Sequence, residues 1–184
     1  MKKNCLLGFG EVWRLFLLVK ATKEIKGDLA EVGVYKGRSA KIICLAKGTR
    51  PLHLFDTFAG LPSVDYRIDP AFLYKGLYAA SFLKVKKYLK KYQNVYYYKG
   101  VFPKTAAGVK NRQFALVHLD VDTYKSTKAC LEFFYPRMNR GGVIVSHDYF
   151  GPAKGVAKAF DEYFKNRKET IIKMPGSQCM ITKL

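Results

Sequence analysis

The chain has 184 residues, of which 49% are hydrophobic, and this length and composition predict one folded domain and argue against disorder. Lys and Arg number 33 against 14 Asp and Glu, which gives a formal charge of +19. Such a charge attracts polyanions such as nucleic acid, anionic lipid or phosphorylated substrates, unless it serves solubility alone. Between Pro70 and Leu119 the sequence contains no acidic residue.

Signals for membrane insertion or export are weak. The apolar run 12–19 is too short to span a bilayer and contains Arg14, so no transmembrane segment is expected. It lacks a clear signal-peptide cleavage site, and a packing or interface helix fits it better. The cysteines lack zinc or redox spacing, and three of them lie in apolar stretches: the set is Cys5, Cys44, Cys130 and Cys179. We therefore expect a cytoplasmic protein.

Short apolar runs alternate with longer amphipathic runs, the pattern of a parallel α/β sheet. The expected strands are 29–34, 52–56, 95–98, 115–119 and 143–146. The expected helices are 10–26, 38–47, 82–92, 126–138 and 153–166, with a short helix after Pro103. Ser81 is expected to cap helix 82–92, with Leu83 and Leu89 facing inward. The runs 170–173 and 178–182 predict a terminal antiparallel hairpin.

These elements make one domain, 1-184, with a Rossmann-like, doubly wound, seven-stranded sheet that is mostly parallel. Residues 1-26 form an N-terminal helical extension of it. The stretch 57–80 is rich in Gly and Pro and predicts a loop; loops of this length are usually functional or mobile. Its polar residues Asp65, Tyr66, Arg67 and Asp69 make it a candidate lid over an acceptor.

Acidic residues follow the predicted strands at their carboxyl ends, the edge where open parallel sheets bind ligands: they are Glu31, Asp56, Asp120, Asp122 and Asp148. In the first turn, 31–37, the glycines are too few for the dinucleotide fingerprint. Gly33 would let the backbone approach a ligand closely, and Gly37 suits the turn into the next helix. A glutamate there favours a positively charged cofactor, although glycines in such turns are common for packing reasons alone.

Asp56 ends the second strand, where α/β folds hold the hydroxyls of an adenosine ribose. The alternative is an aspartate that caps a helix or orders a loop. His118 lies in the middle of a strand and is expected in the core, whereas His53 has no evident partner.

The stretches Asp120-Val121-Asp122 and His147-Asp148 follow neighbouring strands, whose ends lie about 5 Å apart. Their side chains can converge on a divalent ion, and oxygen ligands favour magnesium, calcium or manganese. Such a metal lowers the pKa of a bound hydroxyl. Alternatively, Asp-x-Asp is a weak motif, and His147 could be a buried histidine bonded to backbone.

Four stretches, 27–37, 55–62, 119–127 and 135–149, run in the order found in one known family. Among them are Phe-Asp-Thr-Phe-Ala-Gly-Leu-Pro from Phe55 and Asp-Val-Asp-Thr-Tyr-Lys-Ser-Thr from Asp120. On these residues the chain resembles a class I S-adenosylmethionine-dependent methyltransferase, and more narrowly the macrocin O-methyltransferase family, which methylates sugar hydroxyls. It departs from the family in having His147-Asp148 where paired aspartates are usual, and in being shorter.

The resemblance implies roles for individual residues. The cofactor would be bound by Glu31, Gly33, Tyr35, Gly37, Ser39, Asp56, Thr57, Ser81 and Asp120. A divalent metal, magnesium or manganese, would be held by Asp120, His147 and Asp148. Asp120 and His147 would be the catalytic residues, with Asp120 helping to deprotonate the acceptor hydroxyl.

We therefore expect transfer of a methyl group from S-adenosylmethionine to a hydroxyl of a sugar or glycan-type small molecule, assisted by a divalent metal. The sequence leaves undecided whether the acceptor is anionic and whether the protein forms a homo-oligomer. One alternative is an RNA-directed methyltransferase, which would explain the charge but is not favoured. Others are a metal-dependent glycosyltransferase that uses Asp120-x-Asp122 and a non-catalytic scaffold.

Overall fold

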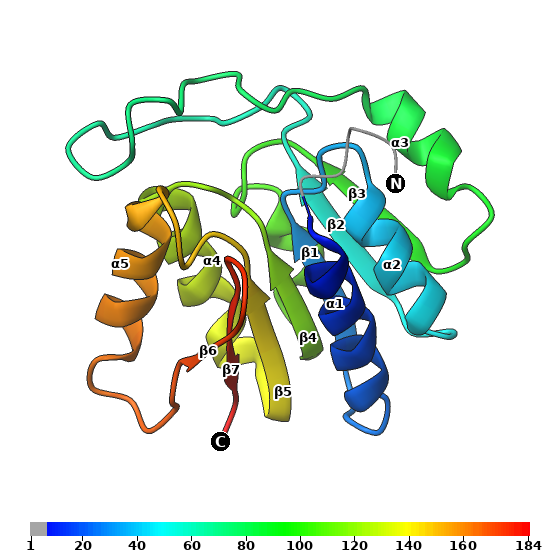
Figure 1. The fold of residues 1–184 in the computed structure, drawn as a ribbon. Helices are drawn as coiled ribbons and strands as arrows, with labels where there is room; N and C mark the ends of the chain where they lie inside the picture. The colour runs from blue at the N-terminus through cyan, green and yellow to red at the C-terminus, as the bar shows by residue number, and fades with distance from the viewer. Residues whose placement is uncertain (1–6) are drawn as a thin grey trace.

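The computed structural model describes residues 7–184 and shows a seven-stranded sheet with the strand order β3-β2-β1-β4-β5-β7-β6 (Figure 1). The parallel strands are β1 (Asp28–Val32), β2 (Leu52–Asp56), β3 (Val95–Lys99), β4 (Phe114–Leu119) and β5 (Met138–Ser146). The antiparallel strands are β6 (Ile172–Lys173) and β7 (Cys179–Thr182). The predicted doubly wound sheet and its terminal hairpin are confirmed. The chain order reverses between β1 and β4, and such a switch point forms a ligand crevice.

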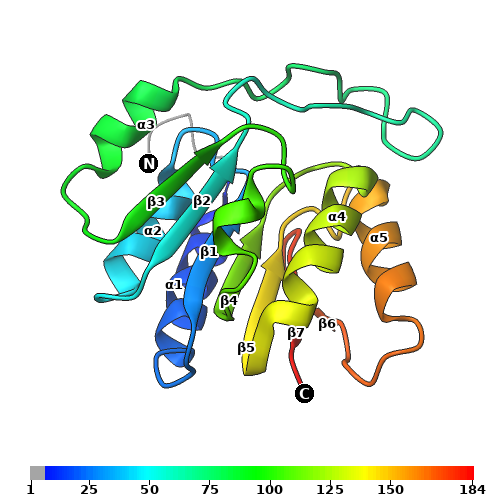
Figure 2. The same ribbon diagram turned by 180° about the vertical axis from the view of Figure 1, so that it is seen from behind.

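Helices cover both faces of the sheet (Figures 1 and 2). One face carries α1 (Phe9–Ala21), α2 (Arg38–Ala46) and α3 (Phe82–Leu89). The other carries the 3-10 helices η1 (Ala106–Val109) and η2 (Tyr135–Arg137) together with α4 (Tyr124–Phe134) and α5 (Lys154–Phe164). Each layer buries its own apolar cluster against the sheet, so the core has two halves.

All five predicted helices differ from the observed ones at one or both ends, and α3 also differs in the side that it buries. The α1 helix ends at Ala21 because the hydroxyl of Thr22 turns back to donate to the carbonyls of Leu18 and Val19. Ser81 caps α3 as expected, accepting a hydrogen bond from the Lys84 amide. The inward placement of Leu83 is wrong, because the buried residues of α3 are Val85 and Leu89, and a residue two positions before Val85 lies on the opposite side of a helix.

The remaining sequence expectations concern the loop and the cysteines. Residues 57–80 contain no helix or strand, as predicted, and we call them the lid loop. Cys44, Cys130 and Cys179 are buried and free, also as predicted, while Cys5 lies outside the described residues. Within residues 7–184, no helix is both long and apolar enough to cross a bilayer.

The aromatic core under β2 and β4 should dominate stability. Phe134 is fully buried, and its ring centroid lies 5.2 Å from that of Phe102 and 5.0 Å from that of Phe114. Phe134→Ala should lower the free energy of unfolding by about 3–5 kcal/mol, because a large cavity replaces the ring. Leu83→Ala, at a side chain that is 75% exposed, should change it by about 0.5 kcal/mol or less. Urea denaturation measures both, and equal losses would contradict this placement of the core.

Candidate active site

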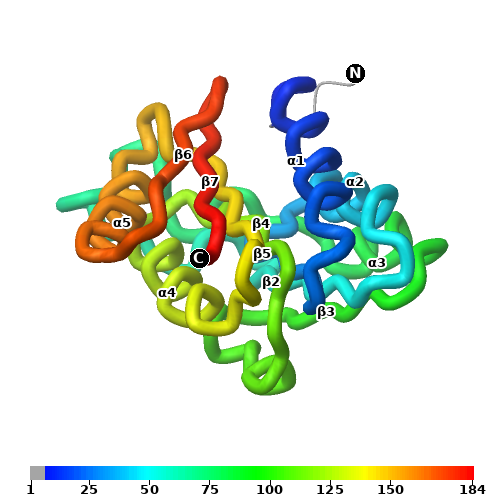
Figure 3. Tube along the Cα trace, turned by 90° about the horizontal axis from the view of Figure 1, so that it is seen from below, coloured from blue at the N-terminus to red at the C-terminus, as the bar shows by residue number. Residues whose placement is uncertain are grey.

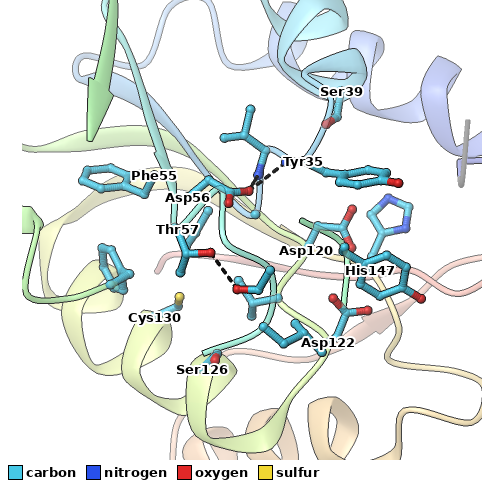
Figure 4. Close-up of a pocket in the computed structure, with 18 of the residues that line it drawn as sticks. Tyr35, Ser39, Phe55, Asp56, Thr57, Asp120, Asp122, Ser126, Cys130 and His147 are labelled. Atoms are coloured by element: carbon cyan, nitrogen blue, oxygen red, sulfur yellow. Dashed lines mark hydrogen bonds between the residues drawn. The ribbon is translucent and has the colours of Figure 1, made fainter. Parts of the chain in front are cut away.

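A cavity of about 330 Å³ opens at the carboxyl ends of the parallel strands (Figure 4). Figure 4 shows Asp56 and Thr57 on one side of it and Asp120, Asp122 and His147 on the other. Most residues predicted for the site line this cavity: Gly33, Tyr35, Ser39, Asp56, Thr57, Asp120, Asp122, His147 and Asp148. The predicted residues that do not line it are Glu31, Gly37 and Ser81.

Asp56 orders the loops around the cavity. Its Oδ2 atom accepts hydrogen bonds from the amides of Val34 and Tyr35, both at 2.7 Å, and its Oδ1 accepts one from Phe58 at 2.6 Å. These bonds tie the β1–α2 turn to the start of the lid loop. The loop-ordering role considered for this aspartate is therefore present, and it leaves one of about four acceptor positions of the carboxylate available.

Gly33 serves the contact between two strands. It has a φ of +87°, and a Cβ atom here would lie 1.8 Å from the carbonyl oxygen of Asp120. The close approach that requires glycine is thus made to the end of β4, whereas the sequence suggested an approach to a ligand. Gly37 precedes α2 in the left-handed region, as expected for the turn, and lies against Val85.

Glu31 is placed away from the cavity, contrary to expectation. The register of β1 and β4 sets it beside His118, and its Oε1 lies 2.8 Å from His118 Nδ1 with both side chains fully buried. Among residues 7–184, neither Glu31 Oε2 nor His118 Nε2 has a hydrogen-bond partner. The pair belongs to the α1–α2 side of the sheet. Ser81 is likewise occupied elsewhere, as the exposed cap of α3.

Three carboxylates, which we call the carboxylate cluster, lie together on the cavity wall: Asp120, Asp122 and Asp148. Burial, and then the charges of Asp148 and Asp56, raise the pKa of Asp122 to about 7. Burial, followed by the charges of Asp122 and Asp148, raises the pKa of Asp120 well above its usual range. The pKa of Asp148 is raised by burial first and by Glu11 second. At neutral pH the cluster therefore retains protons.

His147 does not join the carboxylates. Its Nε2 lies 2.8 Å from the amide nitrogen of Gln178, and its Nδ1 lies 3.4 Å from the hydroxyl of Ser177. Burial, and then His118, lower the pKa of His147 to about 3, so the ring is neutral. A neutral ring that accepts from Gln178 at Nε2 carries its proton on Nδ1. Both nitrogens are thus directed to the turn before β7.

The expected metal triad of Asp120, His147 and Asp148 is therefore not assembled. The two nitrogens that could bind a metal already contact protein atoms. Across the described range, 7–184, no group of three or more His, Cys, Asp or Glu side chains is arranged to hold a metal ion.

Backbone strain concentrates at the cavity. Six non-glycine residues in the described chain have a positive φ, and four of them line it: Tyr35, Tyr78, Asp122 and Asp148. Such conformations cost on the order of 1–3 kcal/mol each and persist where the surrounding structure demands them, often at functional sites. The ring centroids of Tyr35 and Tyr78 lie 5.8 Å apart in an edge-on arrangement.

The lid loop folds back over the cavity. The Leu61 amide donates to the Leu77 carbonyl, and the Gly76 amide returns a bond to the Leu61 carbonyl. Asp69 fastens the loop to the start of α4 by accepting from the Tyr124 amide at 2.9 Å. Because Tyr78 belongs to this loop and lines the cavity, the loop forms part of the site.

Sequence reasoning missed several site residues. Tyr78, Ser126, Cys130 and Ser177 line the cavity. Ser126 lies in the stretch that begins at Asp120, which could have identified it, whereas the other three lie outside the motifs. His53, which had no evident partner, lies 2.9 Å from Asp28 and 3.0 Å from Tyr98. The core placement of His118 is confirmed.

Solved structures with the same fold are methyltransferases. The O-methyltransferase NovP has a TM-score of 0.81 at 21% sequence identity, with 99% of this chain and 83% of NovP covered. The calicheamicin methyltransferase CalS11 has a TM-score of 0.80 at 22% identity, with 94% and 78% covered. At these identities the likeness establishes a methyltransferase-type fold.

The family follows from the sequence. The profile of the macrocin O-methyltransferase family (TylF) matches residues 17–177, and the chain belongs to this family. One curated relative is the 8-demethyl-8-(2,3-dimethoxy-alpha-L-rhamnosyl)-tetracenomycin-C 4'-O-methyltransferase of Streptomyces olivaceus. It is 29% identical over 140 residues, which cover 68% of this chain and 54% of the relative. The match thus spans about half the length of that relative.

The contact at Gly33 can be tested with a matched glycine. Gly48 also has a positive φ, of +63°, but a Cβ there would meet nothing within 4 Å. Gly48→Ala should cost about 1–2 kcal/mol of unfolding free energy, from backbone strain alone. Gly33→Ala should cost about 1–3 kcal/mol more, because its methyl group collides with Asp120. Chemical denaturation compares them, and equal costs would show that β1 and β4 do not meet in this way.

Proposed function

We propose that this protein is an O-methyltransferase that transfers a methyl group from S-adenosylmethionine to a hydroxyl of a sugar or glycan-type small molecule. One observation carries the proposal: the cavity at the β1–β4 switch point joins Asp56 to the carboxylate cluster. Membership of the macrocin O-methyltransferase family supports it and argues against the glycosyltransferase alternative. A sugar acceptor is in keeping with the rhamnosyl group in the name of the curated relative.

The cavity lining fits S-adenosylmethionine in two halves. Phe55, Phe102 and Cys130 give an apolar wall for an adenine ring, next to the remaining acceptor position of Asp56 for a ribose hydroxyl. Gly33 and Tyr35 lie at the other half, where the oxygen atoms of the carboxylate cluster can accept hydrogen bonds from an amino group and face a sulfonium. S-adenosylmethionine supplies a methyl group that is already activated for transfer.

The protein must then align the acceptor oxygen and accept its proton. Asp122 is suited to this, because a pKa of about 7 leaves it able to exchange a proton at neutral pH. As the carbon–oxygen bond forms and the carbon–sulfur bond breaks, the hydroxyl proton passes to Asp122, and S-adenosylhomocysteine leaves. Asp120, which the family resemblance implies as the base, has its pKa raised well above the usual range by burial and then by Asp122 and Asp148, and we assign the role to Asp122 instead. His147 positions the cavity wall through Gln178.

The ligand set predicted for magnesium or manganese does not fit, because His147 is directed away from Asp120 and Asp148. The proposed steps therefore use protein groups alone. The lid loop closes the acceptor side through Leu61, Pro62 and Tyr78. We further propose that the enzyme works in a reducing, cytoplasmic setting, which the three buried free cysteines support.

The assignment of the base is tested by comparing two isosteric variants. Asp122→Asn should reduce kcat on a rhamnoside acceptor by about 10²–10⁴-fold, the usual contribution of a general base. Calorimetric titration with S-adenosylhomocysteine should still show binding, because Asp56 and the apolar wall for the adenine ring are left in place. Asp120→Asn leaves the proposed base in place and should cost much less. If the wild-type protein fails to bind S-adenosylhomocysteine, the proposed function is wrong. If Asp120→Asn loses activity and Asp122→Asn keeps it, only the assignment of the base is wrong.

The pH profile should report the same group. The deprotonated carboxylate is the active form, so kcat/KM should rise with pH and level off above a pKa of about 7. Asp148→Asn removes the second cause of that raised pKa and should move the rise to lower pH. Glu24→Gln, at an exposed side chain far from the cavity, should leave the profile unchanged. If Asp148→Asn leaves the pH at which kcat/KM rises unchanged, the charge of Asp148 does not raise the pKa of the base.

A further inference from the structure

The outward side of α1 is apolar. Its exposed large side chains are Phe9 (70% exposed), Trp13 (52%) and Leu17 (45%). A spacing of four residues places all three in one stripe along the helix. The ring of Trp13 stacks on that of Phe16 at 5.6 Å, and the Lys20 ammonium lies 5.9 Å above the Phe16 ring. Within residues 7–184, the fold leaves this stripe exposed.

The neighbouring helices continue the same surface. Leu45 is the one exposed side chain of α2, at 52%, and Leu83 of α3 is 75% exposed. The Lys41 ammonium of α2 lies 4.9 Å above the ring of Tyr88 on α3, so the outer sides of these two helices meet. Figure 3 shows α1, α2 and α3 as one layer on the same side of the molecule. We call the exposed residues of this layer the outer surface.

Positive charge accompanies the apolar side chains. The α3 helix and the turn after it expose a run of lysines: Lys84, Lys86, Lys87, Lys90 and Lys91. Neither α2 nor α3 contains an acidic residue, and Glu11 of α1 is turned to the Ser177 amide and hydroxyl. The outer surface thus combines apolar side chains with a nearly unopposed cationic field.

We propose that the outer surface docks on an anionic lipid bilayer. Apolar side chains on one side of a helix, flanked by lysines, enter the boundary between headgroups and acyl chains, and tryptophan prefers that depth. Negative lipids attract the exposed lysines of α3 and of the turn after it, which belong to the same outer surface. A second copy of this chain would bring another charge of +19 against the first, which repels it. Nucleic acid matches the charge but gives Phe9 and Leu17 no apolar phase to enter.

Docking in this way would bring the membrane beside the cavity. Leu7 lines the cavity, and Phe9 begins α1 two residues later. The cavity lies at the carboxyl ends of the strands, and α1 and α3 begin near that edge (Figure 1). This placement suits an acceptor sugar that is carried by a lipid, a consequence that rests on the proposed function, whereas the docking itself does not.

The chain contains its own probe for the experiment, because Trp13 is its one tryptophan. Adding vesicles of phosphatidylcholine with phosphatidylglycerol should shift the tryptophan emission to shorter wavelength, and the protein should sediment with them. Vesicles of phosphatidylcholine alone should give neither effect. High salt should weaken the binding, because it screens the lysines. Brominated lipids should quench the shifted emission, since the ring lies among acyl chains.

Matched variants separate insertion from simple charge attraction. Leu17→Ser should weaken vesicle binding about tenfold or more, the loss expected for one buried aliphatic side chain. The double variant Lys87→Glu with Lys91→Glu should weaken binding to anionic vesicles in particular. Ile172→Ser, at a side chain 44% exposed on β6, should bind as the wild type does. Thermal unfolding checks that all of these variants are folded.

Three outcomes would overturn the proposal. In the first, the protein neither sediments with anionic vesicles nor changes its emission. In the second, it sediments with them while its emission stays unchanged, which means charge attraction without insertion. The emission could instead shift in lipid-free concentrated protein while light scattering reports a dimer, in which case a second copy covers the stripe. Each is independent of whether S-adenosylhomocysteine binds, so failure here leaves the proposed function standing.

Discussion

The close approach of β1 and β4 at their carboxyl ends is the constraint on which the site depends. The Gly33 amide donates to the Phe55 carbonyl, and the Asp120 amide donates to the Val32 carbonyl, so three central strands are held together where they end. The absence of a Cβ atom at Gly33 permits this contact. The two sides of the cavity, one with Asp56 and the other with the carboxylate cluster, thereby face each other across a single crevice.

The aspartates around the cavity differ in the contacts that their carboxyl groups make. Asp56 accepts three backbone hydrogen bonds, from Val34, Tyr35 and Phe58. Asp120 and Asp122 are crowded with other carboxylates, and burial penalises their charges. Groups of the same type take different chemical roles when their surroundings differ in this way. On this basis Asp56 orders the loops around the cavity, whereas Asp122, whose pKa burial and Asp148 raise to about 7, is the group we propose for proton exchange.

Much of the fold was predictable because hydrophobic periodicity records it: β2 has the predicted bounds, and the lid loop is where Gly and Pro placed it. The site was predictable only as a sheet edge. Successive residues of a strand face opposite sides of the sheet, so Glu31 faces the side opposite to Ala30 and Val32. This alternation could have predicted that Glu31 does not line the cavity. The partner of His147 could not be foreseen, because Gln178 is 31 residues away and reaches it only through the hairpin.

The α1 helix lies between the cavity and the outer surface. One side of it supports the cavity wall from behind, because Arg14 donates to the side-chain oxygen of Gln178, whose amide nitrogen contacts His147, and to the carbonyl of Pro175. Its outer side carries the apolar stripe. A helix held on one side by polar contacts to the β6–β7 hairpin is a rigid support for a surface that enters lipid. The same contacts fix the distance between that surface and the carboxylate cluster, so a docked molecule would hold its cavity at a constant position relative to the bilayer.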